Sequence, residues 1–138
     1  MPVLAPPPAA VAGTVDHRAV VTLASGRRVI VEGVVDRRGV PPRCTVRIDG
    51  QPLATIGYGD LEAYGCGGLH AAGRLRADAG RPRIGLIYDV FSPNARFRTA
   101  LVMRSVRARW AIEPGSPGRF DDTEAAQSLA ALRRADQR

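Results

Sequence analysis

Apolar and polar residues alternate along most of this chain, in short segments separated by turns rich in glycine, proline and aspartate. In the first such segment, residues 14–23, one set of alternating positions is mostly apolar and the other is mostly polar. Successive side chains of a β-strand point to opposite faces, so this period is typical of a strand with one buried face. The pattern recurs up to residue 112 and therefore predicts an all-β fold.

Six or seven strands fit this pattern. We expect them at residues 14–23, 27–35, 43–49, 52–58, 69–77, 83–90 and 96–112. The dipeptides Ser25-Gly26 and Asp49-Gly50 are good hairpin turns. Short strands joined by tight turns are typical of a barrel or a sandwich. We expect a small β-barrel of six to seven strands with a short C-terminal helix.

The chain divides into four parts by composition. Residues 1–13 are rich in proline and alanine and are expected to be a disordered arm. Residues 14–113 form the predicted barrel domain, residues 114–120 a linker, and residues 121–136 the C-terminal helix. Asp121 is the expected N-cap of that helix, with Glu124 at its third position and Phe120 as a hydrophobic staple.

Residues 94–109 contain five arginines and no acidic residue. The apolar positions change phase midway through this predicted strand, which predicts a β-bulge near Arg104-Ser105. With that bulge, all five guanidinium groups face outward together and form an anion-binding stripe. A second pair of arginines shares one face of the strand at residues 69–77. The predicted nucleic-acid-binding residues are Arg74, Arg76, Arg96, Arg98, Arg104, Arg107 and Arg109.

The overall charge agrees with an anionic partner. The 138 residues include 20 basic and 13 acidic ones, which gives a net charge of +7, and every basic residue is arginine. Arginine suits bidentate contacts with phosphate. A GC-rich genome, which replaces lysine by arginine everywhere, would produce the same composition. Outward charges on an edge strand would also prevent sheet-to-sheet aggregation without any anionic partner.

The two cysteines, Cys44 and Cys66, are too few to form a structural zinc site alone. The first residues show no secretory signal, and no apolar run is long enough to span a bilayer. We therefore expect a cytoplasmic protein with reduced thiols and no membrane contact. The sequence also predicts no metal or cofactor site.

The glycine-rich segment at residues 57–68 is the only attractive place for catalysis. Acidic, tyrosine, cysteine and histidine side chains gather in this segment and just after it, namely Asp60, Glu62, Tyr64, Cys66 and His70. Cys66 and His70 would form a nucleophile pair only if the backbone brought them together. A turn N-capped by Asp60 explains the same residues more simply. We therefore expect no catalytic residue and a non-enzymatic protein.

Residues 29–90 resemble the oligonucleotide-binding (OB) fold of bacterial single-stranded-DNA-binding proteins. The similar parts are Val29–Gly33 as a first strand, the hairpin at Asp49-Gly50, Tyr58–Tyr64 as a linking helix, and Gly67–Arg76 as the next strand. The resemblance implies an OB-like barrel and single-stranded nucleic acid as the partner.

Three functions remain open from the sequence. The first is a binding protein that holds single-stranded nucleic acid on the arginine surface. The second is a small-molecule-binding barrel, either a carrier or an enzyme of the cyclase or isomerase kind, with Tyr88, Tyr58 or His17 inside a cavity. The third is a homo-oligomer, such as a homodimer, or a partner-binding module. Tyr88, Phe97 and Trp110 fall on apolar faces and are expected in the core.

Overall fold

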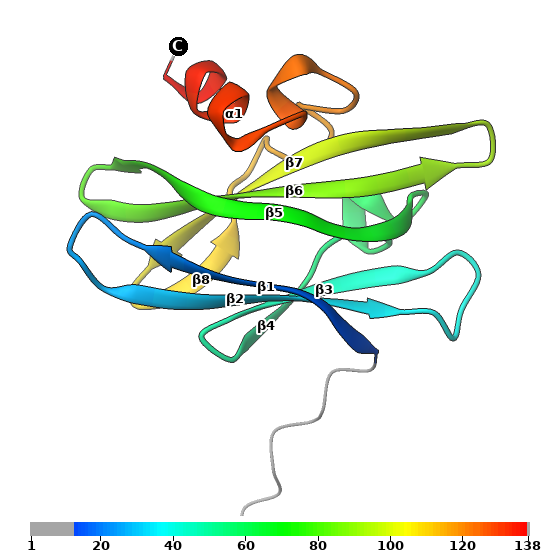
Figure 1. Ribbon diagram of the computed structural model, residues 1–138, viewed down its shortest axis with the longest axis horizontal. Helices are drawn as coiled ribbons and strands as arrows, with labels where there is room; N and C mark the ends of the chain where they lie inside the picture. The colour runs from blue at the N-terminus through cyan, green and yellow to red at the C-terminus, as the bar shows by residue number, and fades with distance from the viewer. Residues whose placement is uncertain (1–12, 138) are drawn as a thin grey trace, which may run out of the picture.

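Eight antiparallel strands form two four-stranded sheets in the computed structural model, which describes residues 13–137 (Figure 1). The first sheet contains β1 (Thr14–Thr22), β2 (Arg28–Asp36), β3 (Arg43–Ile48) and β4 (Gln51–Ala54). The second contains β5 (Gly65–Asp78), β6 (Arg81–Ser92), β7 (Ala95–Val106) and β8 (Arg109–Ile112). Each sheet is a simple meander, 1-2-3-4 and 5-6-7-8.

The all-β prediction is confirmed, but the predicted closed barrel of six to seven strands is wrong. The eight strands are divided between two stacked sheets, so the described residues form a sandwich. The arm predicted for residues 1–13 lies outside the described residues, except for Gly13. No helix among residues 13–137 is both long and apolar enough to cross a bilayer.

The predicted bulge at Arg104-Ser105 is also wrong, because a hairpin turn accounts for the change of apolar phase. The β6–β7 pairing runs without a register shift, and β7 ends at Val106. Arg107 and Ala108 then both take positive φ angles, 53° and 63°, and β8 returns antiparallel to β7. Paired positive φ angles are the geometry of tight hairpin turns.

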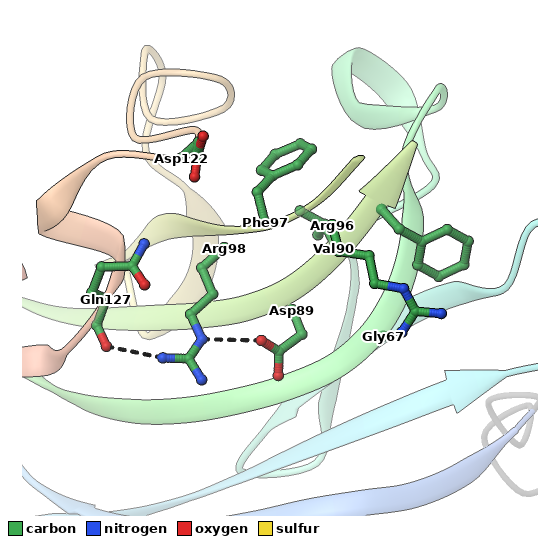
Figure 2. A pocket seen from close by; sticks show the side chains of 9 residues that line it. Gly67, Asp89, Val90, Arg96, Phe97, Arg98, Asp122 and Gln127 are labelled. Carbon is green, nitrogen blue, oxygen red and sulfur yellow. Dashed lines mark hydrogen bonds and ion pairs between the residues drawn. The ribbon is translucent and has the colours of Figure 1, made fainter. Parts of the chain in front are cut away.

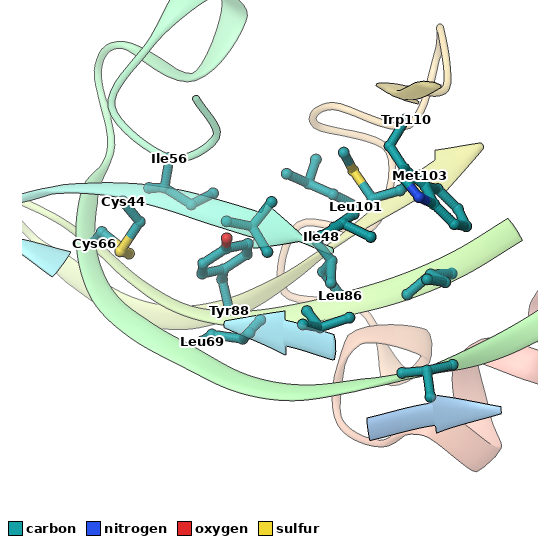
Figure 3. Packing of buried hydrophobic residues seen from close by; sticks show 14 of the residues in the cluster. Cys44, Ile48, Ile56, Cys66, Leu69, Leu86, Tyr88, Leu101, Met103 and Trp110 are labelled. Carbon is teal, nitrogen blue, oxygen red and sulfur yellow. A yellow bond between two sulfur atoms is a disulfide. The ribbon is translucent and has the colours of Figure 1, made fainter. Parts of the chain in front are cut away.

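The main core lies between the two sheets (Figure 3). Ile48 of β3, Leu86 of β6 and Leu101 of β7 are fully buried there. Tyr88 is also fully buried, and its hydroxyl lies 2.9 Å from that of Thr55. Thr55 donates its one proton to the carbonyl oxygen of Cys44 at 3.0 Å, so Tyr88 is the donor in the hydroxyl pair. Each polar atom of this buried pair therefore has a partner.

Cys44 of β3 and Cys66 of β5 form a disulfide that joins the two sheets. Both residues are buried in the core, at 1% and 2% exposure. The expected reduced thiols are therefore wrong. The two cysteines are 22 residues apart in the chain, and that spacing alone does not indicate that the ends of two different strands meet.

The C-terminal segment covers the outer face of the second sheet and makes a third layer (Figure 1). It contains a 3-10 turn, η2 (Glu124–Ala126), and one helix, α1 (Leu129–Asp136). Leu132 of α1 is fully buried. Gly85 of β6 makes room for it, since a Cβ at this position would lie 2.6 Å from the Leu132 Cδ2 atom.

The short C-terminal helix is confirmed, but its predicted start is wrong. The N-cap is Ser128, whose hydroxyl accepts a hydrogen bond from the Ala131 N–H at 3.1 Å. Asp121 instead accepts hydrogen bonds from the hydroxyl groups of Tyr64 and Thr99. The same hydrogen bond from Tyr64 raises the pKa of this tyrosine. The Asp121 carboxylate thus ties the C-terminal segment to the sandwich and is not free to cap a helix.

Candidate functional site

Five of the seven predicted arginines lie at one end of the second sheet. The antiparallel order brings the last residues of β5 and β7 to the same end as the first residues of β6 and β8. One row across the four strands, Leu75–Arg83–Arg104–Ala111, fixes this alignment. We call the exposed or half-exposed arginines here the basic end; they are Arg74, Arg76, Arg81, Arg104, Arg107 and Arg109.

The basic end carries an excess of positive charge, although it also contains the exposed Asp78, which lies opposite Arg81 in the β5–β6 pairing. Within residues 13–137, none of its six arginines lies within 4.0 Å of a carboxylate oxygen. Arg104 is half-buried, and its Nε atom is buried without a hydrogen-bond partner. Arg104 lies on the face that the C-terminal segment covers, whereas Arg74 shares the opposite face with Ile84, so these guanidinium groups surround the end of the sheet. Like charges gathered in this way create a positive potential that attracts anions.

Two acidic residues near the basic end are already engaged by Arg83. Its guanidinium bonds to the Glu113 carboxylate at 2.8 and 3.2 Å and to the Asp136 carboxylate with two bonds of 2.8 Å. These partners raise the pKa of Arg83. Asp136 lies in α1, so Arg83 fastens the helix to the sheet. Glu113 and Asp136 are therefore not free to pair with the arginines of the basic end.

The predicted single stripe of five outward arginines is wrong. Arg96 and Arg98 lie at the opposite end of β7 from Arg104. Between them on the same face, Ala100 and Val102 are buried under the C-terminal segment. The continuous arginine surface expected from the alternation is therefore interrupted by a packed helix layer.

Arg98 has a structural role. Its Nε donates to the Asp89 carboxylate at 3.0 Å, and its Nη1 donates to the Gln127 carbonyl oxygen at 3.2 Å (Figure 2). The Arg98 carbonyl oxygen also accepts the Asp122 N–H at 2.9 Å. This arginine is neutralised by Asp89 and holds the C-terminal segment against β7, so it is not available to an anion.

A surface groove of about 510 Å³ surrounds Arg98, and we call it the Phe97 groove. It lies between β6, β7 and the C-terminal segment (Figure 2). Its walls include Asp89, Arg96, Phe97, Arg98, Asp122 and Gln127. The predicted residue Arg96 thus belongs to a second candidate site, away from the basic end.

The catalytic candidates do not form a reactive pair. Cys66 is bonded to Cys44 and buried, so the Cys66–His70 nucleophile pair is excluded. His70 instead lies beside Asp89 at 3.9 Å and Arg98 at 3.4 Å. Asp60 lies in the first turn of the 3-10 helix η1 (Gly59–Leu61), whose N-cap is Tyr58, so the predicted N-cap role of Asp60 is wrong. The part of the chain that the structure describes holds no group of three or more side chains placed to bind a metal ion.

The residues expected inside a ligand cavity occupy different environments. Tyr88 is packed in the core, His17 is half-buried in β1, and Tyr58 lies half-exposed with the Arg43 guanidinium 5.2 Å from its ring centre. Phe97 is half-buried and Trp110 is buried, as predicted. Side chains fill the space between the sheets where a barrel would hold its ligand.

Comparisons with protein-family models, curated proteins and solved structures find no match to this chain. The resemblance to the OB fold of single-stranded-DNA-binding proteins therefore stays a prediction. The candidate function rests on the chemistry of the two surfaces described above.

Proposed function

We propose that this protein is a non-enzymatic binding protein whose basic end holds the phosphate backbone of a single-stranded nucleic acid. One observation carries the proposal: the strand order gathers six arginines at one end of a sheet, and among residues 13–137 none of them has a carboxylate oxygen within 4.0 Å. Binding would release counterions from the nucleic acid, which gives affinity without base-specific contacts.

The aromatic residues near this end support phosphate contacts over base stacking. Trp110 of β8 is only 6% exposed, and Phe120 is 5% exposed beneath the Arg119 guanidinium. Stacking platforms for single strands need exposed rings. We therefore expect weak dependence on base sequence and strong dependence on salt.

A salt titration of binding tests the proposal. The probe is a short fluorescent oligothymidylate, and the readout is anisotropy at increasing sodium chloride. Arg104→Gln, Arg107→Gln and Arg109→Gln together should lower the slope of log affinity against log salt by about 2, since each contact to a single strand contributes about 0.7. No binding of the wild type at low salt would overturn the proposal.

A charge-matched control separates a site from general attraction. Arg18→Gln, Arg37→Gln and Arg96→Gln remove the same charge from exposed positions outside the basic end. We expect this variant to keep most of the affinity and slope of the wild type. Equal losses in both triple variants would mean that net charge, not the basic end, governs binding.

The predicted cytoplasmic location stays a proposal, and the disulfide weighs against it. Disulfides persist in oxidising compartments and are rare in a reducing cytoplasm. Because Cys44 and Cys66 are bonded, we expect the binding form of the protein to be the oxidised one. The titration is therefore run on oxidised protein.

A homo-oligomeric or partner-binding role is a second candidate, and the open face of the first sheet favours it. Val20 of β1 and Ile30 of β2 are neighbours in register and are 59% and 37% exposed. Adjacent apolar side chains on an uncovered sheet face can support association. Light scattering at several salt concentrations tests it, and a monomer at all of them would reject self-association.

A further inference from the structure

The Phe97 groove displays two opposite charges that do not pair with each other. Arg96 and Asp122 both line it, and among residues 13–137 neither forms an ion pair. Figure 2 shows Asp122 on one side of Phe97 and Arg96 on the other, with the Arg96 side chain directed toward Gly67. A ligand that carries one charge of each sign could therefore satisfy both residues at once.

The groove walls are held in place by contacts that a ligand would not have to form. Arg98 fixes Asp89 and the Gln127 main chain, and its own carbonyl oxygen fixes the Asp122 N–H. The Phe97 ring packs edge-on against Tyr64, with ring centres 5.7 Å apart. These contacts hold the groove walls, so the entropy cost of binding falls mainly on the exposed Arg96 side chain.

The remaining surface of the groove suits an apolar group. Phe97, Phe91 and Val90 all contribute to its lining, and Phe97 and Phe91 are half-exposed. The volume of about 510 Å³ lies within the range of small-molecule sites, roughly 300–1,000 Å³. The ligand class that matches all three features is small and zwitterionic, with an apolar side chain.

We propose that the Phe97 groove binds an amino acid or a short peptide as its zwitterion. The ammonium group pairs with Asp122, the carboxylate pairs with Arg96, and the apolar side chain packs on Phe97. This site is independent of the basic end, since the two surfaces lie at opposite ends of β7. Binding of nucleic acid and binding of the zwitterion can therefore succeed or fail separately.

The test uses phenylalanylglycine and two derivatives that each lack one of its charges. The N-acetyl derivative lacks the ammonium group, and the C-terminal amide lacks the carboxylate. Binding to the intact protein is followed by amide NMR titration, with the signals of Arg96, Arg98 and Asp122 as reporters. We expect the parent dipeptide to bind in the groove. Removal of either ligand charge should weaken binding roughly fivefold, the size expected for a partly exposed ion pair.

Two variants link each ligand charge to its partner. Arg96→Gln changes an exposed side chain, and Asp122→Asn places asparagine at a φ of 52°, which asparagine tolerates. Acetylation should weaken binding to the wild type but not to Asp122→Asn. Amidation should weaken binding to the wild type but not to Arg96→Gln. Arg37→Gln and Asp60→Asn are the matched controls and should bind like the wild type.

Two outcomes would overturn the proposal. The first is the absence of shifts in the groove signals at millimolar dipeptide. The second is binding that is unchanged by acetylation and amidation, which would mean that the apolar group alone is recognised. Correct folding of each variant is read from the same NMR spectra, so a misfolded variant is recognised before its affinity is compared.

Discussion

The side-chain carboxamide of Gln51 makes two hydrogen bonds with the main chain of Trp110. Its Nε2 donates to the Trp110 carbonyl oxygen at 2.8 Å, and its Oε1 accepts from the Trp110 N–H at 2.8 Å. Gln51 begins β4 and Trp110 lies in β8, so the contact joins the edges of the two sheets. A carboxamide has the same donor and acceptor as a peptide group, and it occupies a strand edge that would otherwise be open to pairing.

Replacement of Gln51 by alanine should destabilise the sandwich. Loss of two hydrogen bonds predicts a fall of about 1–2 kcal/mol in the free energy of unfolding. Denaturant unfolding can be followed by the fluorescence of Trp110, the single tryptophan. Hydrogen exchange of the Trp110 N–H should also accelerate.

Gln127→Ala is the matched control for this experiment. Its side chain donates one exposed hydrogen bond, to the Thr123 carbonyl oxygen within the same segment. We expect it to change stability by less than Gln51→Ala. If Gln51→Ala left both stability and Trp110 exchange unchanged, the bridge between the sheets would have no energetic role.

Removal of the disulfide should lower the free energy of unfolding more than the loss of any single hydrogen bond does. Cys44→Ala with Cys66→Ala releases a cross-link across 22 residues, and chain-entropy arguments give a loss of about 3 kcal/mol. Dithiothreitol should destabilise the wild type and leave the double variant unchanged. Free thiols detected by mass spectrometry in freshly purified wild-type protein would contradict the expected covalent link.

The sequence predicts a turn correctly where the turn residues have a strong preference for positive φ angles, and misses a turn where they do not. Asp49-Gly50 was predicted because aspartate and glycine tolerate the positive φ angles of 48° and 82° found there. The turn at Arg107-Ala108 has the same backbone geometry without a glycine, asparagine or aspartate, so its residues carry no turn signal. The change of apolar phase was a correct observation, but a hairpin explained it and a bulge did not.

The sequence predicts that arginines form the candidate site, but it does not predict which arginines lie together and which are paired with carboxylates. Arg98 and Arg104 belong to one strand, but Arg98 lies opposite Asp89 of β6 and also bonds to the Gln127 main chain, whereas Arg104 lies opposite Arg83. A signal for the C-terminal segment was present: Ile84–Tyr88 contains apolar residues on both faces of β6, as does the run at residues 100–103. Strands that are apolar on both faces are typical of a sheet covered on both sides.

Alkaline pH should destabilise the protein through two tyrosines. The hydrogen bond to Asp121 raises the pKa of Tyr64, and burial raises the pKa of Tyr88. The unfolded chain therefore loses these protons first, near pH 10, and binds fewer protons than the folded protein above that pH. The contribution to stability is complete below about pH 10 and is lost as the pH rises through the folded pKa values.

The free energy of unfolding, measured from about pH 9 to about pH 11, checks this expectation. It should decrease with pH in the wild type and decrease less in a Tyr64→Phe, Tyr88→Phe double variant. Equal slopes in the two proteins would mean that neither hydroxyl is held in its neutral form by the fold.

The packing of α1 against the second sheet should depend on Gly85. A methyl group there would lie 2.6 Å from the Cδ2 atom of Leu132 and 3.3 Å from both terminal carbons of Leu75. Both leucines are buried, so neither can move aside freely. Gly85→Ala should therefore lower the free energy of unfolding by about 1–3 kcal/mol, the usual effect of overpacking. Amide exchange in α1 should accelerate more than exchange in β2, since the strain falls on the helix contact.

Gly39→Ala is the control, because the nearest atom to its added Cβ is the Pro41 carbonyl oxygen at 3.8 Å. Equal stability of the two variants would mean that α1 packs on the sheet without needing the glycine.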